Sequence, residues 1–272
     1  MTASGESRTT RNGLIRSVLI ALGLAGAGVA AEIYFIRSAS GQRLDASTFA
    51  AVSTLRETVG VWVDWLRLVL PGLAAGLAFI VLAFAVVRGR WRSAIAPICL
   101  VILTLVVSTA LKDFLVTRPY FGDYGYPQNT FPSGHTAVTV AVLVAFYWLL
   151  PRPRPLVTIP LTVLGSTAAL FQVASYAHRL SDVIGGALLV GVIAVLLVGP
   201  VGDLRARWRW VFWTGVILAA AVGALCLVSW DLSGYAPEQQ WVATTGIALT
   251  AGASAGAALT AAAERPTQRK AS

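Results

Sequence analysis

Residues 93–115 read SAIAPICLVILTLVVSTALKDFL, an apolar run in which the first charged side chain is Lys112. About 20 such residues, wound as an α-helix, cross a hydrocarbon core roughly 30 Å thick. The stretch therefore predicts a transmembrane helix that ends in a charged segment at one face of the membrane.

The rest of the chain has a similar composition. Hydrophobic residues make up 57% of its 272 residues and charged residues only 12%. These values are far from those of a soluble domain and predict an all-α, polytopic integral membrane helical bundle. Eight spans are predicted, at Leu14–Ile36, Val69–Val87, Ser93–Leu115, Ser133–Leu150, Leu156–Tyr176, Asp182–Val201, Trp208–Trp230 and Trp241–Ala263.

The basic residues indicate how the bundle is oriented. The net charge of +9 comes mainly from arginines that flank the apolar segments. Such a distribution follows the positive-inside bias of membrane proteins, so no nucleic-acid partner is predicted. It places both termini in the cytoplasm of a cell whose plasma membrane the chain crosses. The arginines and lysine on that side are Arg8, Arg11, Arg88, Arg90, Arg92, Arg152, Arg154, Arg205, Arg207, Arg209, Arg265, Arg269 and Lys270.

With this topology, three polar clusters that are distant in sequence reach the same extracytoplasmic face. The first, Lys112–Pro119, follows the third span. The second, Pro132–His135, opens the fourth span, and the third, His178–Asp182, lies between the fifth and sixth spans. Loops that converge on one face can form one site, so the sequence predicts a single active site there.

The first two clusters contain groups that bind phosphate. Lys112 and Arg118 can neutralise phosphate oxygens, and arginine offers a planar bidentate fork. Ser133 and Gly134 are predicted to open a helix, where exposed backbone N–H groups and the helix dipole favour an anion. The acidic residues show no grouped spacing of metal ligands, so neither a metal nor a cofactor is predicted.

The histidines supply reactive groups. The chain has only two, His135 and His178, and an imidazole is costly inside a membrane unless it has a partner or a task. Asp182 follows His178 by four residues, which on a helix would place the carboxylate where it can orient the ring. His178 is then a candidate nucleophile and His135 a candidate general acid.

These motifs resemble those of the type 2 phosphatidic acid phosphatase (PAP2) superfamily, which includes bacterial undecaprenyl diphosphate phosphatases. The resemblance covers roughly residues 69–201. It implies a six-helix core and a metal-independent phosphatase with a phosphohistidine intermediate. It also implies that His178 is the nucleophile, with Asp182 as its partner and His135 as the acid. The implied phosphate ligands are Lys112, Arg118, Ser133 and Gly134.

Two positions depart from the family pattern. The first motif usually has six residues between its lysine and its Arg-Pro, whereas five separate Lys112 from Arg118. The third motif usually has an arginine six residues before its histidine, where this chain has Gln172. Arg179, which follows His178 directly, is a candidate to replace the missing phosphate-binding charge. The alternative for Arg179 is an arginine that extends to lipid headgroups.

The remaining segments complete the predicted organisation. Residues 1–68 hold a first span and an exterior segment, residues 69–201 the catalytic core, and residues 202–272 two added spans with a basic tail. The segment Ala46–Leu68 has apolar residues at helical spacing and predicts an amphipathic helix, either a lid on the neighbouring spans or a guide for lipid. Aromatic residues in the loop Tyr120–Thr130 predict anchoring in the headgroup region.

The sequence thus predicts a membrane phosphatase for a lipid phosphate or diphosphate, with polyprenyl diphosphate as the first choice of substrate. Phosphatidic acid or another lipid monophosphate is the alternative substrate. A non-catalytic lipid-phosphate binding or transport protein on the same core is the alternative function, and Gln172 is its main support.

Overall fold

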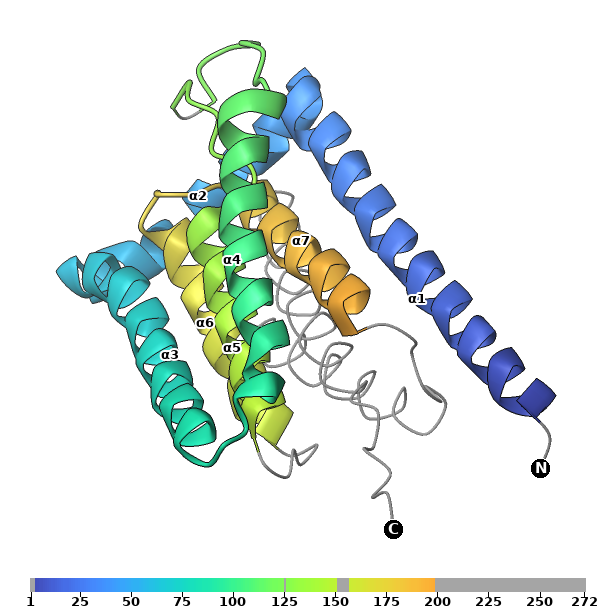
Figure 1. Ribbon diagram of the computed structural model, residues 1–272. Coiled ribbons are helices and arrows are strands. Elements are labelled where there is room, and N and C mark those ends of the chain that lie inside the picture. The colour runs from blue at the N-terminus through green and yellow to red at the C-terminus, as the bar shows by residue number, and fades with distance from the viewer. Residues whose placement is uncertain (1–2, 125, 151–156, 199–272) are drawn as a thin grey trace.

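The computed structural model describes residues 3–124, 126–150 and 157–198, and this part of the chain is helical without strands. Its helices pack into a bundle (Figure 1). They are α1 (Ala3–Ala31), α2 (Ala39–Val59), α3 (Val61–Val87), α4 (Ile95–Ala110), α5 (Gly134–Leu149), α6 (Thr158–Ala174) and α7 (Leu180–Val198), with the short turns η1 (Glu32–Ile36), η2 (Trp91–Ala94) and η3 (Leu111–Leu115). The predicted all-α polytopic membrane bundle is confirmed.

Four of the described stretches are long and apolar enough to cross a membrane. They are Ser17–Ile36, Val61–Val87, Trp91–Leu115 and Leu180–Leu197. The predicted fourth and fifth spans correspond to α5 and α6, which are shorter apolar helices of 16 and 17 residues. The predicted spans Trp208–Trp230 and Trp241–Ala263 lie outside the described residues, so the number eight stays a prediction.

The predicted amphipathic segment Ala46–Leu68 is divided between two helices. α2 ends at Val59 and α3 begins at Val61, with Gly60 between them at a φ of 56°. Glycine adopts this left-handed value without the steric penalty of a Cβ atom, so it ends one helix and lets the next start in a new direction. The transmembrane helix that was predicted to begin at Val69 therefore begins two turns earlier. α2 packs against α3, α6 and α7.

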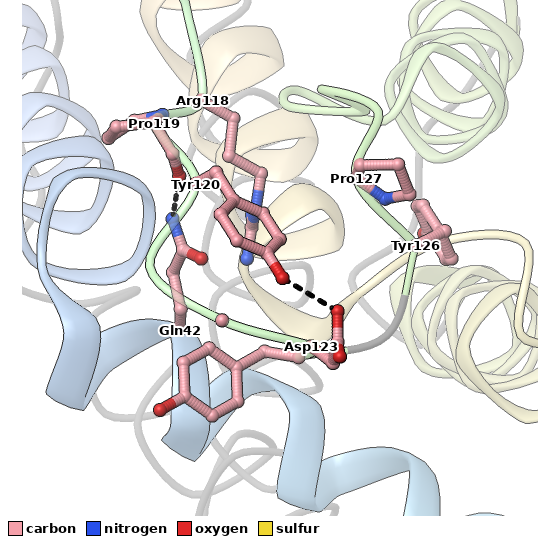
Figure 2. A pocket seen from close by; sticks show the side chains of 9 residues that line it. Gln42, Arg118, Pro119, Tyr120, Asp123, Tyr126 and Pro127 are labelled. Carbon is pink, nitrogen blue, oxygen red and sulfur yellow. Dashed lines mark hydrogen bonds between the residues drawn. The ribbon is translucent and has the colours of Figure 1, made fainter.

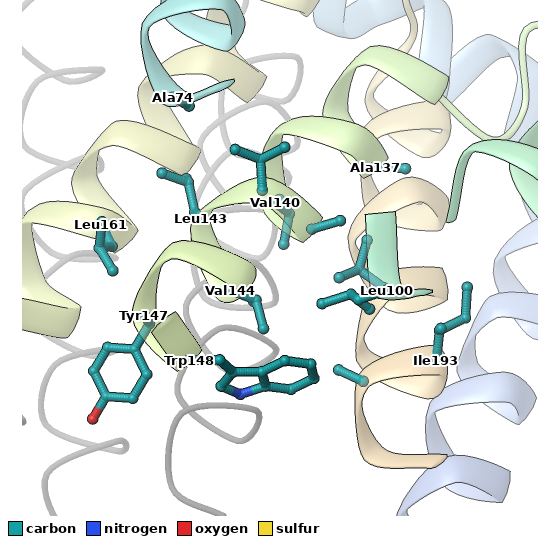
Figure 3. Packing of buried hydrophobic residues seen from close by; sticks show 14 residues of the cluster. Ala74, Leu100, Ala137, Val140, Leu143, Val144, Tyr147, Trp148, Leu161 and Ile193 are labelled. Carbon is teal, nitrogen blue, oxygen red and sulfur yellow. The ribbon is translucent and has the colours of Figure 1, made fainter. Parts of the chain in front are cut away.

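The centre of the bundle is α5, which is buried along most of its length. Val140, Leu143 and Trp148 of this helix pack with Leu100 of α4 and Ile193 of α7 (Figure 3). In a membrane such contacts stabilise the bundle through close van der Waals packing, because lipid tails are as apolar as the side chains. This packing fixes α5, and with it the position of the motif at its N-terminal end.

α5 and α7 approach each other closely near that end. A Cβ atom at Gly186 of α7 would lie 2.7 Å from the carbonyl oxygen of Ser133 and 3.2 Å from the backbone nitrogen of Ala137. A side chain larger than hydrogen at this position would push the two helices apart. Small residues allow such close contacts between transmembrane helices. Gly186 therefore brings the start of α5 next to the start of α7.

Candidate active site

The two histidines lie side by side where α5 and α7 begin. His135 is in the first turn of α5, and His178 precedes Leu180, the first residue of α7. The centroids of the two rings are 5.9 Å apart, with 57° between the ring planes. His178 is 8% exposed, whereas His135 faces outward. One small substrate group can therefore contact both rings.

Asp182 stands beside His178 on a fixed support. Its Oδ2 atom lies 3.6 Å from Nδ1 of His178. The same oxygen accepts hydrogen bonds from the backbone N–H of Arg179 at 2.9 Å and from Oγ1 of Thr130 at 2.5 Å. His178 lies before α7 rather than within it, so the predicted helical spacing does not apply. An acidic side chain that reaches back to the backbone at a helix start explains the proximity instead.

The start of α5 has the geometry of an anion site. Ser133 is the N-cap residue of this helix, and its side chain accepts a hydrogen bond from the backbone N–H of Thr136 at 3.2 Å. The backbone N–H of Ser133 donates to the carbonyl oxygen of Asp182 at 2.8 Å. This bond ties the second motif to the third. The first N–H groups of α5, with the positive end of its dipole, are next to His135.

Lys112 and Arg118 occupy different environments at the end of α4. The Lys112 side chain is 35% exposed, with Asp113 at 3.9 Å. The Arg118 side chain is only 3% exposed and lies 4.0 Å from the carboxylate of Asp45. Burial and the neighbouring charge of Arg179 lower the pKa of Arg118, while Asp45 and Asp182 oppose this shift. Neither terminal nitrogen of Arg118 has a hydrogen-bond partner among the described residues.

Asn129, which sequence reasoning missed, connects the first motif to the loop before the second. Its side-chain amide donates to the carbonyl oxygens of Lys112 at 3.0 Å and of Val116 at 2.8 Å. These carbonyls lie at the end of a helix, where the last carbonyl groups lack partners within the helix. A single Asn in a loop has no sequence pattern that would reveal this contact. At one end of the bundle, the Asn129 side chain thus ties the first motif to the loop before the second motif, and a backbone hydrogen bond joins the second motif to the third.

Residues 93–206 match the PAP2 superfamily. The match runs from η2 through α7 and contains all three motifs, and it supports a phosphatase of the lipid-phosphate type in general. It begins later than the stretch for which the sequence resemblance was predicted, so α3 lies outside it. Neither the search of the curated proteins nor that of the solved structures gave a match.

Arg179, in the third motif, contacts the loop 126–130, whereas the sequence predicts that it contacts phosphate. Its side chain is fully buried. The guanidinium donates to the carbonyl oxygens of Tyr126 and Gln128, and it lies 4.0 Å from the centroid of the Tyr126 ring. These contacts engage its two terminal nitrogens with the loop 126–130, while its buried Nε atom has no hydrogen-bond partner among the described residues. They favour a bracing role over either of the predicted roles, phosphate binding or extension to headgroups.

Gln172, at the position where the PAP2 pattern has arginine, is 1% exposed. Its side-chain amide donates to the backbone carbonyl of Arg67 at 2.9 Å, and the backbone carbonyl of Gln172 accepts from the backbone N–H of His178 at 3.1 Å. Gln172 therefore links α3 to the turn that carries His178. It contributes no charge to the site.

Asp45 of α2 is a second residue that sequence reasoning missed. It is completely buried, and its carboxylate accepts hydrogen bonds from the backbone N–H of Ser181 at 3.0 Å and from the Ser181 hydroxyl at 2.5 Å. Burial, together with the charge of Asp182, raises the pKa of Asp45 to about 7. The carboxylate holds the start of α7 and lies next to Arg118, so α2 is a structural part of the site.

The raised pKa makes the stability of the protein depend on pH. Because the folded-state pKa of about 7 exceeds the ordinary aspartate value of 3.8, the stability associated with Asp45 is present below pH 4 and is lost as pH rises through 7. An Asp45→Asn variant stays neutral. We expect the Tm of this variant to rise relative to the Tm of wild type between pH 5 and 8, when both are measured in detergent. The corresponding change in the relative free energy of unfolding is about a few kcal/mol.

The test is how the Tm difference changes with pH, not its absolute size. The asparagine also loses one hydrogen bond to Ser181, which costs about 1 kcal/mol at every pH. Parallel Tm curves for the two proteins across this pH range would contradict the raised pKa.

A pocket of about 100 Å³ opens beside Arg118 rather than at the histidines. Figure 2 shows Arg118 extending from its loop toward Tyr120 and Asp123, with the Tyr120 hydroxyl donating to the Asp123 carboxylate at 2.8 Å. Gln42 of α2 closes one side by donating to the carbonyl oxygen of Pro119 at 2.8 Å. The predicted aromatic loop thus lines a hollow next to a phosphate-binding candidate.

Proposed function

We propose that this chain is an integral-membrane phosphatase that hydrolyses a lipid phosphate or diphosphate without a metal, through a phosphohistidine at His178. The observation that carries the proposal is the pair of adjacent rings of His135 and His178, 5.9 Å apart, with the Asp182 carboxylate 3.6 Å from His178. The PAP2 match supports the general class of reaction. A site for phosphate binding alone has little use for a second histidine and an orienting carboxylate.

In the first step, His178 attacks phosphorus. Asp182 faces Nδ1, which leaves Nε2 as the attacking atom. The new N–P bond forms as the bond between phosphorus and the leaving oxygen breaks. That oxygen takes the electron pair and receives a proton from His135. For a lipid diphosphate, the leaving group is the lipid monophosphate.

In the second step, water attacks phosphorus and gives a proton to His135, which has become a base. The N–P bond breaks, inorganic phosphate leaves, and both histidines return to their starting states. Throughout, Lys112 and Arg118 balance the charge of the phosphate oxygens, and Ser133 and Gly134 present the start of α5 to them. Groups that are already oriented stabilise the transition state without reorganisation.

The substrate is proposed to be polyprenyl diphosphate, held in the same bilayer as the enzyme and presented at the extracytoplasmic face. Large apolar side chains on α1, α3 and α4 are exposed and fit a lipid surround, for example Leu22, Phe79 and Val106. A lipid anchored there brings its headgroup to the depth where the motif-bearing ends of the helices meet. The cytoplasmic position of the termini rests on the arginine distribution.

The proposal is tested by measuring phosphate release from purified protein in detergent, in the presence of a chelator. Polyprenyl diphosphate and phosphatidic acid are offered side by side at equal concentrations. We expect release that is insensitive to the chelator and faster with polyprenyl diphosphate. Faster release from phosphatidic acid would replace the proposed substrate with a lipid monophosphate. Tight binding of both lipids without release would support the binding or transport alternative and reject catalysis.

A further inference from the structure

The proposed site lacks one cation, because Gln172 occupies the position of the arginine in the third motif and Arg179 is engaged elsewhere. The amide of Gln172 donates to the backbone carbonyl of Arg67 at 2.9 Å. The residue whose backbone carbonyl Gln172 contacts is itself an arginine, carried by α3. This contact joins residues that are 105 positions apart.

Arg67 lies in the second turn of α3, and α3 packs against both α5, which carries His135, and α6, which carries Gln172 (Figure 1). The charge of Arg67 is close enough to act electrostatically on His135, as is that of Lys112. Arg67 is therefore carried by a helix that packs beside both the helix of His135 and the helix of Gln172.

The Arg67 guanidinium has little else to bind. Its Nε atom is buried and has no hydrogen-bond partner among the described residues. Its nearest carboxylate is that of Asp64, 3.9 Å from Nε, and Arg56 lies closer to the same carboxylate at 3.5 Å. The side chain is 30% exposed, so it is accessible to a substrate group. The Nε–H group therefore has no hydrogen bond among the described residues, and an anion can supply one.

The geometry points to Arg67 as the phosphate-binding arginine of this enzyme, supplied by α3 in place of the arginine that the third motif lacks. The inference rests on the proposed function. It means that a residue outside the segment 93–206 completes the phosphate site. It also explains how the chain dispenses with an arginine at position 172, because Gln172 holds the backbone of its replacement.

The test is an Arg67→Gln variant, assayed for lipid phosphate release and for inhibition by inorganic phosphate. Loss of a donor to the transition state lowers rates by about 100-fold to 1,000-fold, and we expect kcat/KM to fall in this range. The inhibition constant for phosphate should rise at least about tenfold, because the same guanidinium binds the product. Arg67→Lys should keep part of the activity and part of the phosphate affinity, since lysine provides charge without the bidentate fork.

Arg56→Gln is the matched control. Arg56 also neighbours Asp64, its side chain is 34% exposed, and it stacks on Tyr176 rather than reaching the histidines. We expect it to stay within about threefold of wild type, as for an exposed ion pair. The double variant Arg67→Gln with Gln172→Arg returns the charge to the motif position, and it should recover activity relative to Arg67→Gln alone.

The results separate the inference from the function on which it rests. If Arg67→Gln releases phosphate and is inhibited by phosphate as wild type is, while His178→Ala is inactive, the inference is wrong and the function stands. A loss of activity with an unchanged phosphate inhibition constant would assign Arg67 a structural role and also overturn the inference. An inactive wild type would reject the proposed function and the inference together.

Discussion

A His178→Ala variant is expected to lose phosphate release by about 10,000-fold or more, the scale on which removal of a catalytic nucleophile acts. Alanine has no atom that can form the N–P bond. The adjacent His135 ring is exposed, and among the residues that the structure describes no carboxylate lies as close to it as Asp182 lies to His178. The measurement is the initial rate of phosphate release from polyprenyl diphosphate in detergent. The variant is first shown to have the same Tm as wild type. A residual rate of one tenth of wild type would contradict the nucleophilic role.

The same variant tests the covalent intermediate. When wild type is mixed with substrate labelled in the phosphate that is removed and then quenched in base, the label should remain on the protein. It should be released in acid, because a phosphohistidine is stable in base and labile in acid. His178→Ala should carry no label. A label that persists in His178→Ala would place the covalent bond on another residue.

Prediction from sequence worked best for features that depend on local pattern. Long apolar runs placed the helices, because a membrane requires about 20 apolar residues for each crossing. The start of α5 at Gly134, with Ser133 as its N-cap, follows from the preference of serine for that position. The convergence of the three clusters followed from counting spans, which alternate between the two faces of the membrane.

Features that depend on contacts between distant segments were not accessible in this way. Asp45 meets Ser181 across 136 positions, and nothing around Asp45 in the sequence marks it as buried. The same holds for Arg67 beside Gln172. Gly60 illustrates a third limit, because apolar periodicity continues across residues 46–68 while the backbone turns at a single glycine.

Arg179 shows why proximity in sequence misleads near a turn. It directly follows His178, so its charge was expected at the phosphate. At the start of α7, however, consecutive side chains point in different directions, and Arg179 reaches the carbonyls of Tyr126 and Gln128. Those carbonyls are buried polar groups that need donors. The guanidinium therefore hydrogen-bonds to the loop 126–130, and our proposal assigns the phosphate charge to Arg67 of α3 instead.

A His135→Ala variant should show a loss that depends on the leaving group. With a lipid monophosphate such as phosphatidic acid, whose leaving oxygen is an alkoxide that needs a proton, we expect the rate to fall by about 100-fold to 10,000-fold, the usual contribution of a general acid. With an aryl phosphate such as p-nitrophenyl phosphate, the leaving oxygen departs without a proton, so formation of the phosphohistidine should fall by less than about tenfold. The measurement is the burst of p-nitrophenol in a rapid-mixing experiment.

This contrast distinguishes a proton donor from a residue that merely shapes the site. His135 lies 5.9 Å from His178, ring centroid to ring centroid, so its removal could also disturb the nucleophile. A disturbed nucleophile would slow both substrates equally, whereas a missing acid slows only the substrate with the poor leaving group. Equal losses with both substrates would therefore remove His135 from the proposed proton transfer. In the hydrolysis step His135 acts as a base for either substrate, so the slow phase after the burst should be depressed with both.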